Sequence, residues 1–245
     1  SQIYSRSGGY MGLSFSIPID VAMDVVDQLR SSGKVTRGRI GVSIQEVTRE
    51  LADSFGLAKA AGALISSVEK AGPADKAGVK ASDVILKFDG KPIVSSVDLP
   101  RIVAATKPGN KVAVQLWRKG NTLDVSLVVG EIQETTEKQR AQAGKESEEL
   151  SQSVSRLGLA VSELNDQQKS ELQVEGGLLV EEVKGAAARS ELQRGDVILA
   201  IGNIEIHTVE QFNEVLKKVP QGRNIALLVR RNEGTVYVPI RLDEK

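Results

Sequence analysis

The stretch GPADKAGVKASDVILKFDGKPI, residues 72–93, aligns without gaps on GAAARSELQRGDVILAIGNIEI, residues 185–206. The alignment continues downstream, where Gly109 falls opposite Gly222 and VAVQLWRKG falls opposite IALLVRRNE. The apolar positions keep their phase throughout, which a chance match would not do over so many residues. Self-similarity at a fixed offset indicates a repeated structural unit. The chain therefore contains two copies of one domain.

The composition excludes several classes of function. The 245 residues include 32 Lys and Arg and 32 Asp and Glu, so there is no electrostatic case for nucleic acid or a membrane surface as the main partner. The absence of cysteine excludes disulfides, thiolate metal sites and cysteine nucleophiles. No His/Asp/Glu cluster stands at ligand spacing, so we expect neither a metal nor a cofactor. No apolar run reaches the roughly 18 residues of a membrane span.

The chain opens at Ser1 without a start methionine or a signal peptide, so we expect a soluble piece of a longer protein.

Each copy is predicted to be mainly β with short helices, an α+β fold. The alternation of Ile40, Val42 and Ile44 with small or polar residues has the period of a half-buried strand. The segments GALISSV and DVILKFDGKPI predict further strands, with Asp89 and Gly90 forming a tight turn. Each copy ends in a segment typical of a hairpin.

One longer helix is predicted in each copy. In the second copy it is TVEQFNEVLKKV, residues 208–219, where Thr208 and Gln211 have the spacing of a capping box. The counterpart is SVDLPRIVAAT, residues 96–106, in which Pro100 is tolerated because it lies near the first turn.

Two further segments belong to neither copy. Residues 1–37 contain YMGLSFSIPID, which predicts a strand, and then an amphipathic helix that we expect to begin at an Asp20 N-cap and to end at Gly33. Residues 131–154 are rich in charge and poor in large apolar side chains, which favours a flexible linker over a solvated helix. We therefore expect the two repeats to fold and unfold separately. The predicted domains are residues 1–37, 38–130, 131–154 and 155–245.

Two short motifs, each present twice, carry a family resemblance. RIGVSI at residues 39–44 and RLGLAV at residues 156–161 precede SDVIL and GDVIL, and the combination resembles tandem PDZ domains, each a partly open β-barrel or sandwich. The pair is similar to that of the periplasmic HtrA/DegP-type (Do-like) serine endoproteases. SQIYSRSGGYMGLSFSIPID, residues 1–20, resembles the last strand and loop of that family's chymotrypsin-like protease domain, and the segment that follows resembles the connector helix into the first PDZ domain. The resemblance implies protein quality control in the bacterial periplasm, where the family degrades or shelters misfolded envelope proteins under stress.

The glycine-rich turn around Ser7 is not expected to hold a catalytic nucleophile. The resemblance places Ser7 downstream of the family's GNSGGP-like nucleophile turn. A serine nucleophile also needs a base that is itself oriented by a third group, and the single histidine, His207, lies far along the chain in the second repeat. We therefore expect no catalytic residue and no peptidase activity in this chain, although the resemblance implies that the parent protein is a serine endopeptidase.

The resemblance implies a peptide site in each repeat, where an extended peptide adds a strand to an edge strand. The implied carboxylate-binding residues are Arg39, Ile40, Gly41, Val42, Arg156, Leu157, Gly158 and Leu159. The implied groove residues are Ile44, Leu99, Val103, Val161, Phe212 and Leu216. Helix phase alone leaves open whether the helical members face the groove or the core. The two glycines could instead relieve crowding, and the two arginines could be solvated charges.

Three other residue types have structural interpretations. Asp83 and Asp196 are expected to cap turns, Trp117 to pack between strands, and His207 to sit at a strand-to-helix turn without a special role.

Two functions remain open. The chain is either a peptide-recognition and regulatory module, or a structural module that holds protease subunits together without binding free peptide. The expected partners are unfolded or misfolded protein substrates, C-terminal peptides and the protease domain of the parent. We expect this chain to be monomeric, the parent to be a homo-oligomer, and the first repeat to be the stronger peptide receptor.

Overall fold

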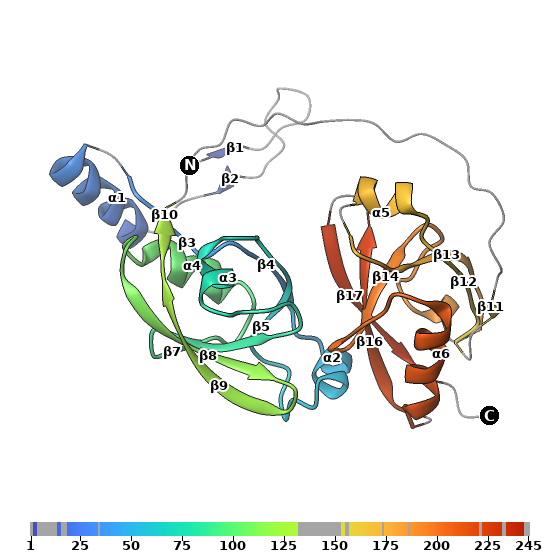
Figure 1. Cartoon of the computed structure of the whole chain (residues 1–245). Helices are drawn as coiled ribbons and strands as arrows, with labels where there is room; N and C mark the ends of the chain where they lie inside the picture. The colour runs from blue at the N-terminus through green and yellow to red at the C-terminus, as the bar shows by residue number, and fades with distance from the viewer. Residues whose placement is uncertain are drawn as a thin grey trace.

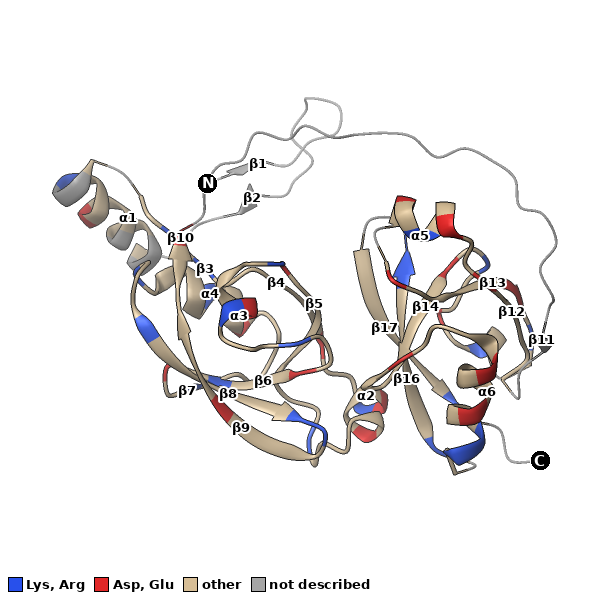
Figure 2. Cartoon of the chain, viewed as in Figure 1, with Lys and Arg blue, Asp and Glu red and all other residues tan. Residues whose placement is uncertain are grey.

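The structure is a computed structural model that describes residues 2–3, 14–15, 19–33, 35–131, 153–154, 157–172, 174–185, 187–220, 222–231 and 234–242. Two antiparallel sheets lie beside each other, each with short helices around it (Figure 1). Acidic and basic residues are interspersed over both repeats (Figure 2). Among the described helices, none combines the length and the hydropathy needed to cross a membrane.

The first repeat forms a sheet in the order β4-β5-β6-β8-β9, with β7 paired to β6, and β3 and β10 form a separate pair. Its elements are β3 (Gly38–Arg39), β4 (Val42–Glu46), α2 (Arg49–Ser54), β5 (Ala63–Val68), α3 (Pro73–Lys76), β6 (Val84–Phe88), β7 (Lys91–Pro92), α4 (Asp98–Ala105), β8 (Lys111–Arg118), β9 (Asn121–Val128) and β10 (Gly130–Glu131).

The second repeat follows the same plan in the order β11-β12-β13-β14-β16-β17, with β15 paired to β14. Its elements are β11 (Ser153–Val154), β12 (Leu159–Glu163), α5 (Asp166–Leu172), β13 (Leu178–Val183), the 3-10 helix η1 (Ala187–Arg189), β14 (Val197–Ile201), β15 (Ile204–Glu205), α6 (Val209–Lys218), β16 (Asn224–Arg231) and β17 (Gly234–Arg241). Even the register shifts recur, between Ser43 and Ile44 in the first sheet and between Ala160 and Val161 in the second. The two copies therefore share their irregularities as well as their strands.

The helices follow the sequence pattern closely. α4 and α6 lie inside the two predicted helical segments. The Thr208 side chain accepts a hydrogen bond from the Gln211 amide at 3.2 Å, as expected of an N-cap. The Gln211 side chain reaches back one residue further than a capping box requires, to the His207 amide at 3.0 Å.

The segment before the first repeat contains β1 (Gln2–Ile3), β2 (Ser14–Phe15) and α1 (Ile19–Ser32). The predicted end of the helix is confirmed, since Gly33 has φ +72° and its amide donates to the Leu29 carbonyl at 3.0 Å. The predicted start is wrong, because α1 already includes Ile19 and Asp20 therefore lies inside it. The first amides of a helix have no intrahelical partner, so the sequence constrains that end weakly. Of the predicted strand at residues 10–20, β2 is described and most of the rest lies outside the described residues.

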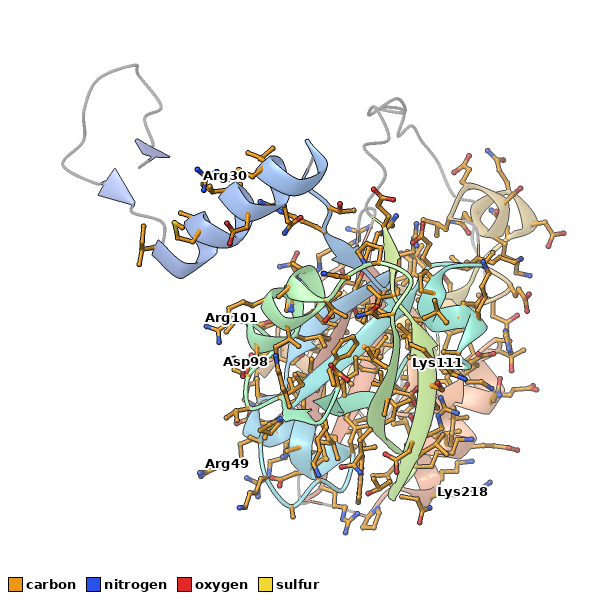
Figure 3. The ribbon with its side chains drawn as sticks, turned by 90° about the vertical axis from the view of Figure 1, so that its left-hand side faces the viewer. Arg30, Arg49, Asp98, Arg101, Lys111 and Lys218 are labelled. Atoms are coloured by element: carbon orange, nitrogen blue, oxygen red, sulfur yellow. The ribbon has the colours of Figure 1, made fainter. Side chains whose placement is uncertain are left out.

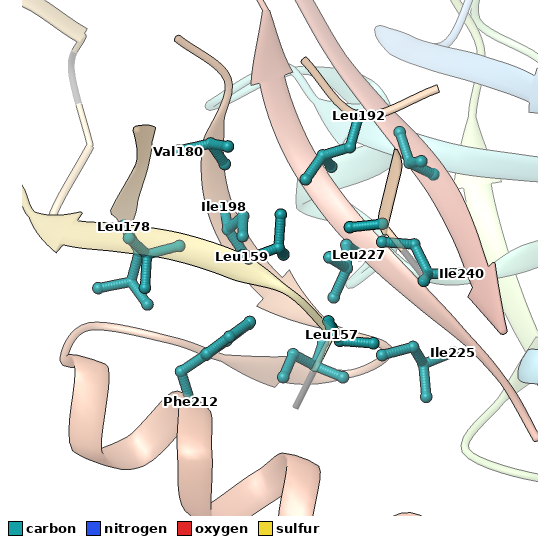
Figure 4. Close-up of a cluster of buried hydrophobic side chains, with 14 of the residues drawn as sticks. Leu157, Leu159, Leu178, Val180, Leu192, Ile198, Phe212, Ile225, Leu227 and Ile240 are labelled. Atoms are coloured by element: carbon teal, nitrogen blue, oxygen red, sulfur yellow. The ribbon is translucent and has the colours of Figure 1, made fainter. Parts of the chain in front are cut away.

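Each repeat has its own hydrophobic core. In the second repeat, side chains from β12, β13, β14, β16, β17 and α6 converge on one cluster, as Figure 4 shows for Leu159, Leu227 and Phe212. The first repeat buries an equivalent set that includes Ile65, Phe88 and Leu116. These cores explain why the alternation of apolar residues is so regular in both copies.

A third cluster joins the two repeats. Leu51 and Phe55, on and just after α2, pack with Leu228 and Tyr237 of the second repeat, and the Phe55 and Tyr237 rings meet edge to face with their centroids 5.3 Å apart. α2 contacts both β16 and β17. This shared cluster counts against the expectation that the two repeats fold and unfold separately, because apolar side chains of each repeat are buried against the other.

Hydrogen bonds across the same interface fix its register. The Gln45 side chain donates to the Tyr237 carbonyl at 2.9 Å and accepts from the Tyr237 amide at 2.8 Å. Thr235 donates to the Ser66 carbonyl at 3.0 Å, and Ser82 donates to the Gly202 carbonyl at 3.0 Å. The Ser82 hydroxyl also bonds the Tyr237 hydroxyl. Of the predicted linker at residues 131–154, Glu131 pairs within the first repeat and β11 within the second, and the residues between lie outside the described part.

Candidate functional site

A cavity of about 460 Å³ lies between strand β4 and helix α4 of the first repeat. All seven site residues that the sequence analysis names in this repeat line it, namely Arg39, Ile40, Gly41, Val42, Ile44, Leu99 and Val103. Leu99 and Val103 also belong to the core cluster, so each of these side chains borders both the cavity and the core. Pro100 and Ala104 complete the helical wall.

One edge of β4 is available for another strand. β4 pairs with β5 on one side, and within the described residues no strand pairs with its other edge. An edge strand presents unpaired backbone N–H and C=O groups, which can bond an extended chain. The cavity therefore lies beside the backbone edge that β-augmentation requires.

The loop that enters β4 turns its amides in one direction. The Ile40 carbonyl accepts from the Ala74 amide at 2.9 Å, and the Gly41 carbonyl accepts from the Glu69 amide at 2.9 Å. In a trans peptide the C=O and the following N–H point in opposite directions. The Gly41 and Val42 amides therefore point away from α3 and β5, an arrangement suited to binding an anion.

Gly41 is required by this loop conformation. Its φ is +72°, a region that residues with a Cβ rarely adopt. A Cβ on Gly41 would also stand 2.7 Å from Oε2 of Glu69. Glu69 in turn pairs with Arg39, with Nη2 and Oε2 2.6 Å apart and both side chains nearly half exposed. Arg39 is therefore neither a fully solvated charge nor, in this structure, an unpaired cation facing the cavity.

The two ends of the cavity differ. At the loop end the chain runs close beneath the C-terminal turn of α4, because a Cβ on Gly38 would collide with the carbonyl oxygens of Val103 and Thr106. At the other end Glu46 closes β4, and its Oε2 accepts from the Ser95 hydroxyl at 3.0 Å and the Ser96 amide at 2.8 Å. Strand and helix thus run in opposite directions along the two walls.

Glu46 has a perturbed ionisation. Burial by itself would raise its pKa, but the hydrogen bonds from Ser96 and Ser95 outweigh this and hold the pKa of Glu46 below its usual range. Sequence reasoning missed this residue. A signal was nevertheless present, since Glu163 occupies the same place in the second copy of the repeat.

The second repeat keeps the loop but not the open edge. Gly158 has φ +76°, the Leu157 carbonyl accepts from the Ala187 amide at 3.1 Å, and the Gly158 carbonyl accepts from the Lys184 amide at 2.8 Å. The outer edge of β12 is paired with β11, with Ser153 opposite Val161 and Val154 opposite Ala160. A short segment of the chain itself thus lies where an added strand would begin to pair.

The predicted apolar site residues of the second repeat are buried in its own core. They are Leu157, Leu159, Val161, Phe212 and Leu216. On β4, the counterparts of Leu159 and Val161, which are Val42 and Ile44, are only partly buried. The counterparts of the other three, Ile40, Leu99 and Val103, are buried as well. Arg156, the remaining predicted member, lies outside the described residues.

The other candidate residues have structural roles. Asp83 accepts from the Lys80 amide at 2.8 Å, as expected of a turn cap, and its two oxygens also accept from Nε and Nη2 of Arg118 at 2.7 and 2.6 Å. Asp196 repeats both features with the Gln193 amide and Arg231.

Trp117 packs beside the third cluster and donates to the Phe55 carbonyl at 2.9 Å. His207 sits between β15 and α6, with Nε2 3.9 Å from Oε2 of Glu205. Ser7 lies outside the described residues, and among those described no three His, Asp or Glu side chains gather as a metal site.

Comparison with known proteins gives matches over both repeats. The PDZ domain family matches residues 38–129 and, separately, residues 179–231. A probable periplasmic serine endoprotease, DegP-like, from Pseudomonas fluorescens is 46% identical over 245 residues, covering 100% of this chain and 51% of that protein. The protein of the same name from Hahella chejuensis is 42% identical over 246 residues, 52% of its length. A solved structure, the HtrA-type protease AlgW with decapeptide, is 34% identical with a TM-score of 0.49, covering 55% of this chain and 42% of that one. The chain spans about half the length of the curated relatives it matches.

Proposed function

The chain belongs to the HtrA-type, DegP-like family of proteins with tandem PDZ domains, and on this basis we propose that its first repeat is a receptor for extended peptides that end in a free carboxylate. The peptide pairs antiparallel to β4 and fills the cavity between β4 and α4. Its terminal carboxylate accepts hydrogen bonds from the Gly41 and Val42 amides, and its last side chain, an apolar one, contacts Leu99 and Val103.

The observation that carries this proposal is the coincidence of three features at one place. The unpaired edge of β4, the loop amides at Gly41 and Val42, and the cavity of about 460 Å³ all meet beside the same strand. Each feature supplies a different part of peptide recognition, namely strand pairing, carboxylate binding and side-chain selectivity. Hydrogen bonds to a charged group contribute about 1.5–3 kcal/mol each, so the free carboxylate is a large part of the affinity.

In the second repeat the same function is weakened. β11 pairs along the edge of β12, and the strand residues Leu159 and Val161 are buried, whereas Val42 and Ile44 of β4 are only partly buried. A peptide would have to displace β11 before it could pair with β12. The first repeat is therefore the main receptor.

The wider role follows from the family. The receptor delivers unfolded or misfolded envelope proteins to a serine endoprotease of the bacterial periplasm, and it regulates that protease. The names of the relatives, each a probable periplasmic serine endoprotease, support this role.

The chain itself binds and does not cleave. Incubation with unfolded casein should give no fragments, and Ser7→Ala should change nothing; serine-dependent cleavage would contradict this part of the proposal.

Isothermal titration of the whole chain tests the receptor. A peptide ending in a free apolar residue should bind saturably with one strong site per chain. The same peptide with an amidated C-terminus is the matched control and should bind at least about tenfold more weakly, because it lacks the charge that the loop amides bind. Equal affinity for the two peptides, or no saturable binding of either, would refute the proposal.

A second candidate function is subunit assembly, and one observation favours it. Ile19, Met23, Val26 and Leu29 form an exposed apolar stripe along α1, which stands apart from both sheets (Figures 1 and 3). Such a stripe suits a protein contact in a homo-oligomeric parent. Sedimentation separates the two functions, since a tight oligomer at micromolar concentration that binds no free peptide would favour assembly alone.

A further inference from the structure

We propose that Glu46 is a positioning residue that ties the two walls of the first groove together at its open end and so holds α4 at the distance a bound peptide requires. This inference rests on the proposed receptor function of the first repeat. Glu46 needs no contact with the peptide for this role, because it acts through the Ser95 hydroxyl and the Ser96 amide, which lie just before α4.

The geometry places Glu46 where such a tie is needed. At the loop end, the close approach of Gly38 to the C-terminal turn of α4 already fixes the spacing of the walls. At the opposite end Leu99, in the first turn of α4, packs in the core that Ile44 of β4 also contacts. Oε2 of Glu46 adds a polar link there, because it accepts from Ser95 and Ser96. These contacts bridge residues 49 and 50 positions apart in the sequence, and they connect the end of β4 to the turn that leads into α4.

The helical side of the tie is itself rigid. Oδ2 of Asp98, in the first turn of α4, accepts from the amides of Val94 and Ser95 at 3.1 and 3.0 Å. Figure 3 labels Asp98 on this helix. The turn that Glu46 bonds is therefore attached to the first turn of α4. A shift of Ser95 and Ser96 relative to β4 should move the start of α4 with it.

The second repeat contains the same tie built from a different local sequence. Glu163 is the last residue of β12, as Glu46 is the last residue of β4. Its Oε1 accepts from the Val209 amide at 3.0 Å, and Val209 is the first residue of α6. In each repeat a glutamate at the end of the strand thus accepts from the region where the groove helix begins, from the first helical residue of α6 and from the turn just before α4. An amide at a helix start has no intrahelical partner, which makes it a natural donor to a carboxylate.

The consequence for binding is preorganisation. A peptide that adds to β4 must fit between β4 and α4, and any widening or narrowing at the open end has to be corrected on binding. Loss of Glu46 removes the hydrogen bonds from Ser95 and Ser96 to β4, so the turn and the start of α4 can shift together relative to β4, although Asp98 still holds Ser95. The loop that binds the carboxylate is left intact, so the effect should be a moderate loss of affinity and not its abolition.

Isothermal titration of the carboxylate-ended peptide against three variants of the whole chain tests the proposal. Glu46→Ala should weaken binding by about threefold to tenfold, because two exposed hydrogen bonds to the turn before α4 are lost. Glu46→Gln keeps an oxygen acceptor in the same place and should bind within about twofold of the parent. Glu163→Ala removes the same tie in the other repeat and should leave the affinity unchanged.

Two further readouts separate a positioning role from other roles. Amide hydrogen exchange at Ser96 should accelerate in Glu46→Ala but not in Glu46→Gln, with or without peptide. Ser95→Ala should weaken binding in the parent and add nothing in the Glu46→Ala background, because both changes break the same tie. Equal losses in Glu46→Ala and Glu46→Gln would overturn the proposal in favour of a direct charge contact with peptide.

Parent-like binding by Glu46→Ala, or unchanged exchange at Ser96, would also overturn it. If the parent chain bound no peptide at all, the receptor function would fail and this inference with it.

Discussion

Replacing Tyr237 by alanine is expected to uncouple the two repeats. The Tyr237 side chain belongs to β17 of the second repeat but is 1% exposed, and it is buried in the cluster shared with Leu51 and Phe55 of the first. Its hydroxyl bonds that of Ser82, also in the first repeat. The intact chain should therefore unfold in one cooperative transition, whereas Tyr237→Ala should unfold in two.

The magnitude follows from the contacts that are lost. Removing a fully buried aromatic side chain costs about 3–5 kcal/mol of unfolding free energy. Tyr237→Phe removes only the hydroxyl, and Ser82 still donates to the Gly202 carbonyl. That variant should lose about 0.5–1.5 kcal/mol and keep the single transition. Differential scanning calorimetry and chemical denaturation followed by circular dichroism measure both quantities.

Val238→Ala is the matched control. Val238 is the next residue of β17 and is equally buried, but it faces the core of the second repeat. Its truncation should cost about 2 kcal/mol without touching the shared cluster. A single transition in Tyr237→Ala, shifted as in Val238→Ala, would refute the reasoning that this ring couples the repeats.

Three other outcomes are expected. Asp83→Ala and Asp196→Ala should each lower the unfolding free energy by about 2–4 kcal/mol in urea titrations. Each buried carboxylate bonds an arginine and a backbone amide. Unchanged unfolding midpoints would contradict this. Burial raises the pKa of Tyr237 from 10.0 to about 12, although the hydrogen bond with Ser82 opposes the shift. The free energy of unfolding should therefore include the full contribution of the neutral hydroxyl below pH 10, and lose it as the pH rises toward 12. An absorbance titration should show one late tyrosine, absent from Tyr237→Phe. Gly41→Val should weaken peptide binding by about 30-fold or more in calorimetry, since valine disfavours φ +72°. Gly158→Val should leave that affinity unchanged but destabilise the second repeat, because its Cβ would meet the carbonyl oxygen of Lys184.

Much of the fold could be predicted from local pattern. The alternation around Ile44, the tight turn after Phe88 and the apolar stripe of residues 209–219 each depend on neighbours in the sequence, and each has its predicted structure. The family resemblance placed a glycine-containing loop before β4, and Gly41 there has φ +72°, a conformation that other residues resist. The prediction of a helix start at Asp20 was wrong because the first turn of a helix is weakly constrained.

The sequence favoured the first repeat as the stronger receptor, but the structural difference between the two candidate grooves, the pairing of β11 along β12, could not be predicted in this way. The sequences RIGV and RLGL predict the same loop, and the structure has the same loop twice. Whether the strand behind the loop offers a free edge depends on what lies beside it. That neighbour is β11 in the second repeat, and a strand of two residues is too short to give a detectable pattern of apolar residues in the sequence.

By itself the sequence determined that the chain is a repeat, which elements each copy contains and which loop enters each receptor strand, because these follow from spacing along the chain. Only the tertiary structure decided how the repeats are joined and which contacts link the end of β4 to the turn before α4. Gln45 bonds a residue 192 positions away, Ser82 one 155 positions away, and Glu46 one 50 positions away. Such contacts depend on which surfaces meet once the sheets have formed, and no periodicity in the sequence encodes that meeting.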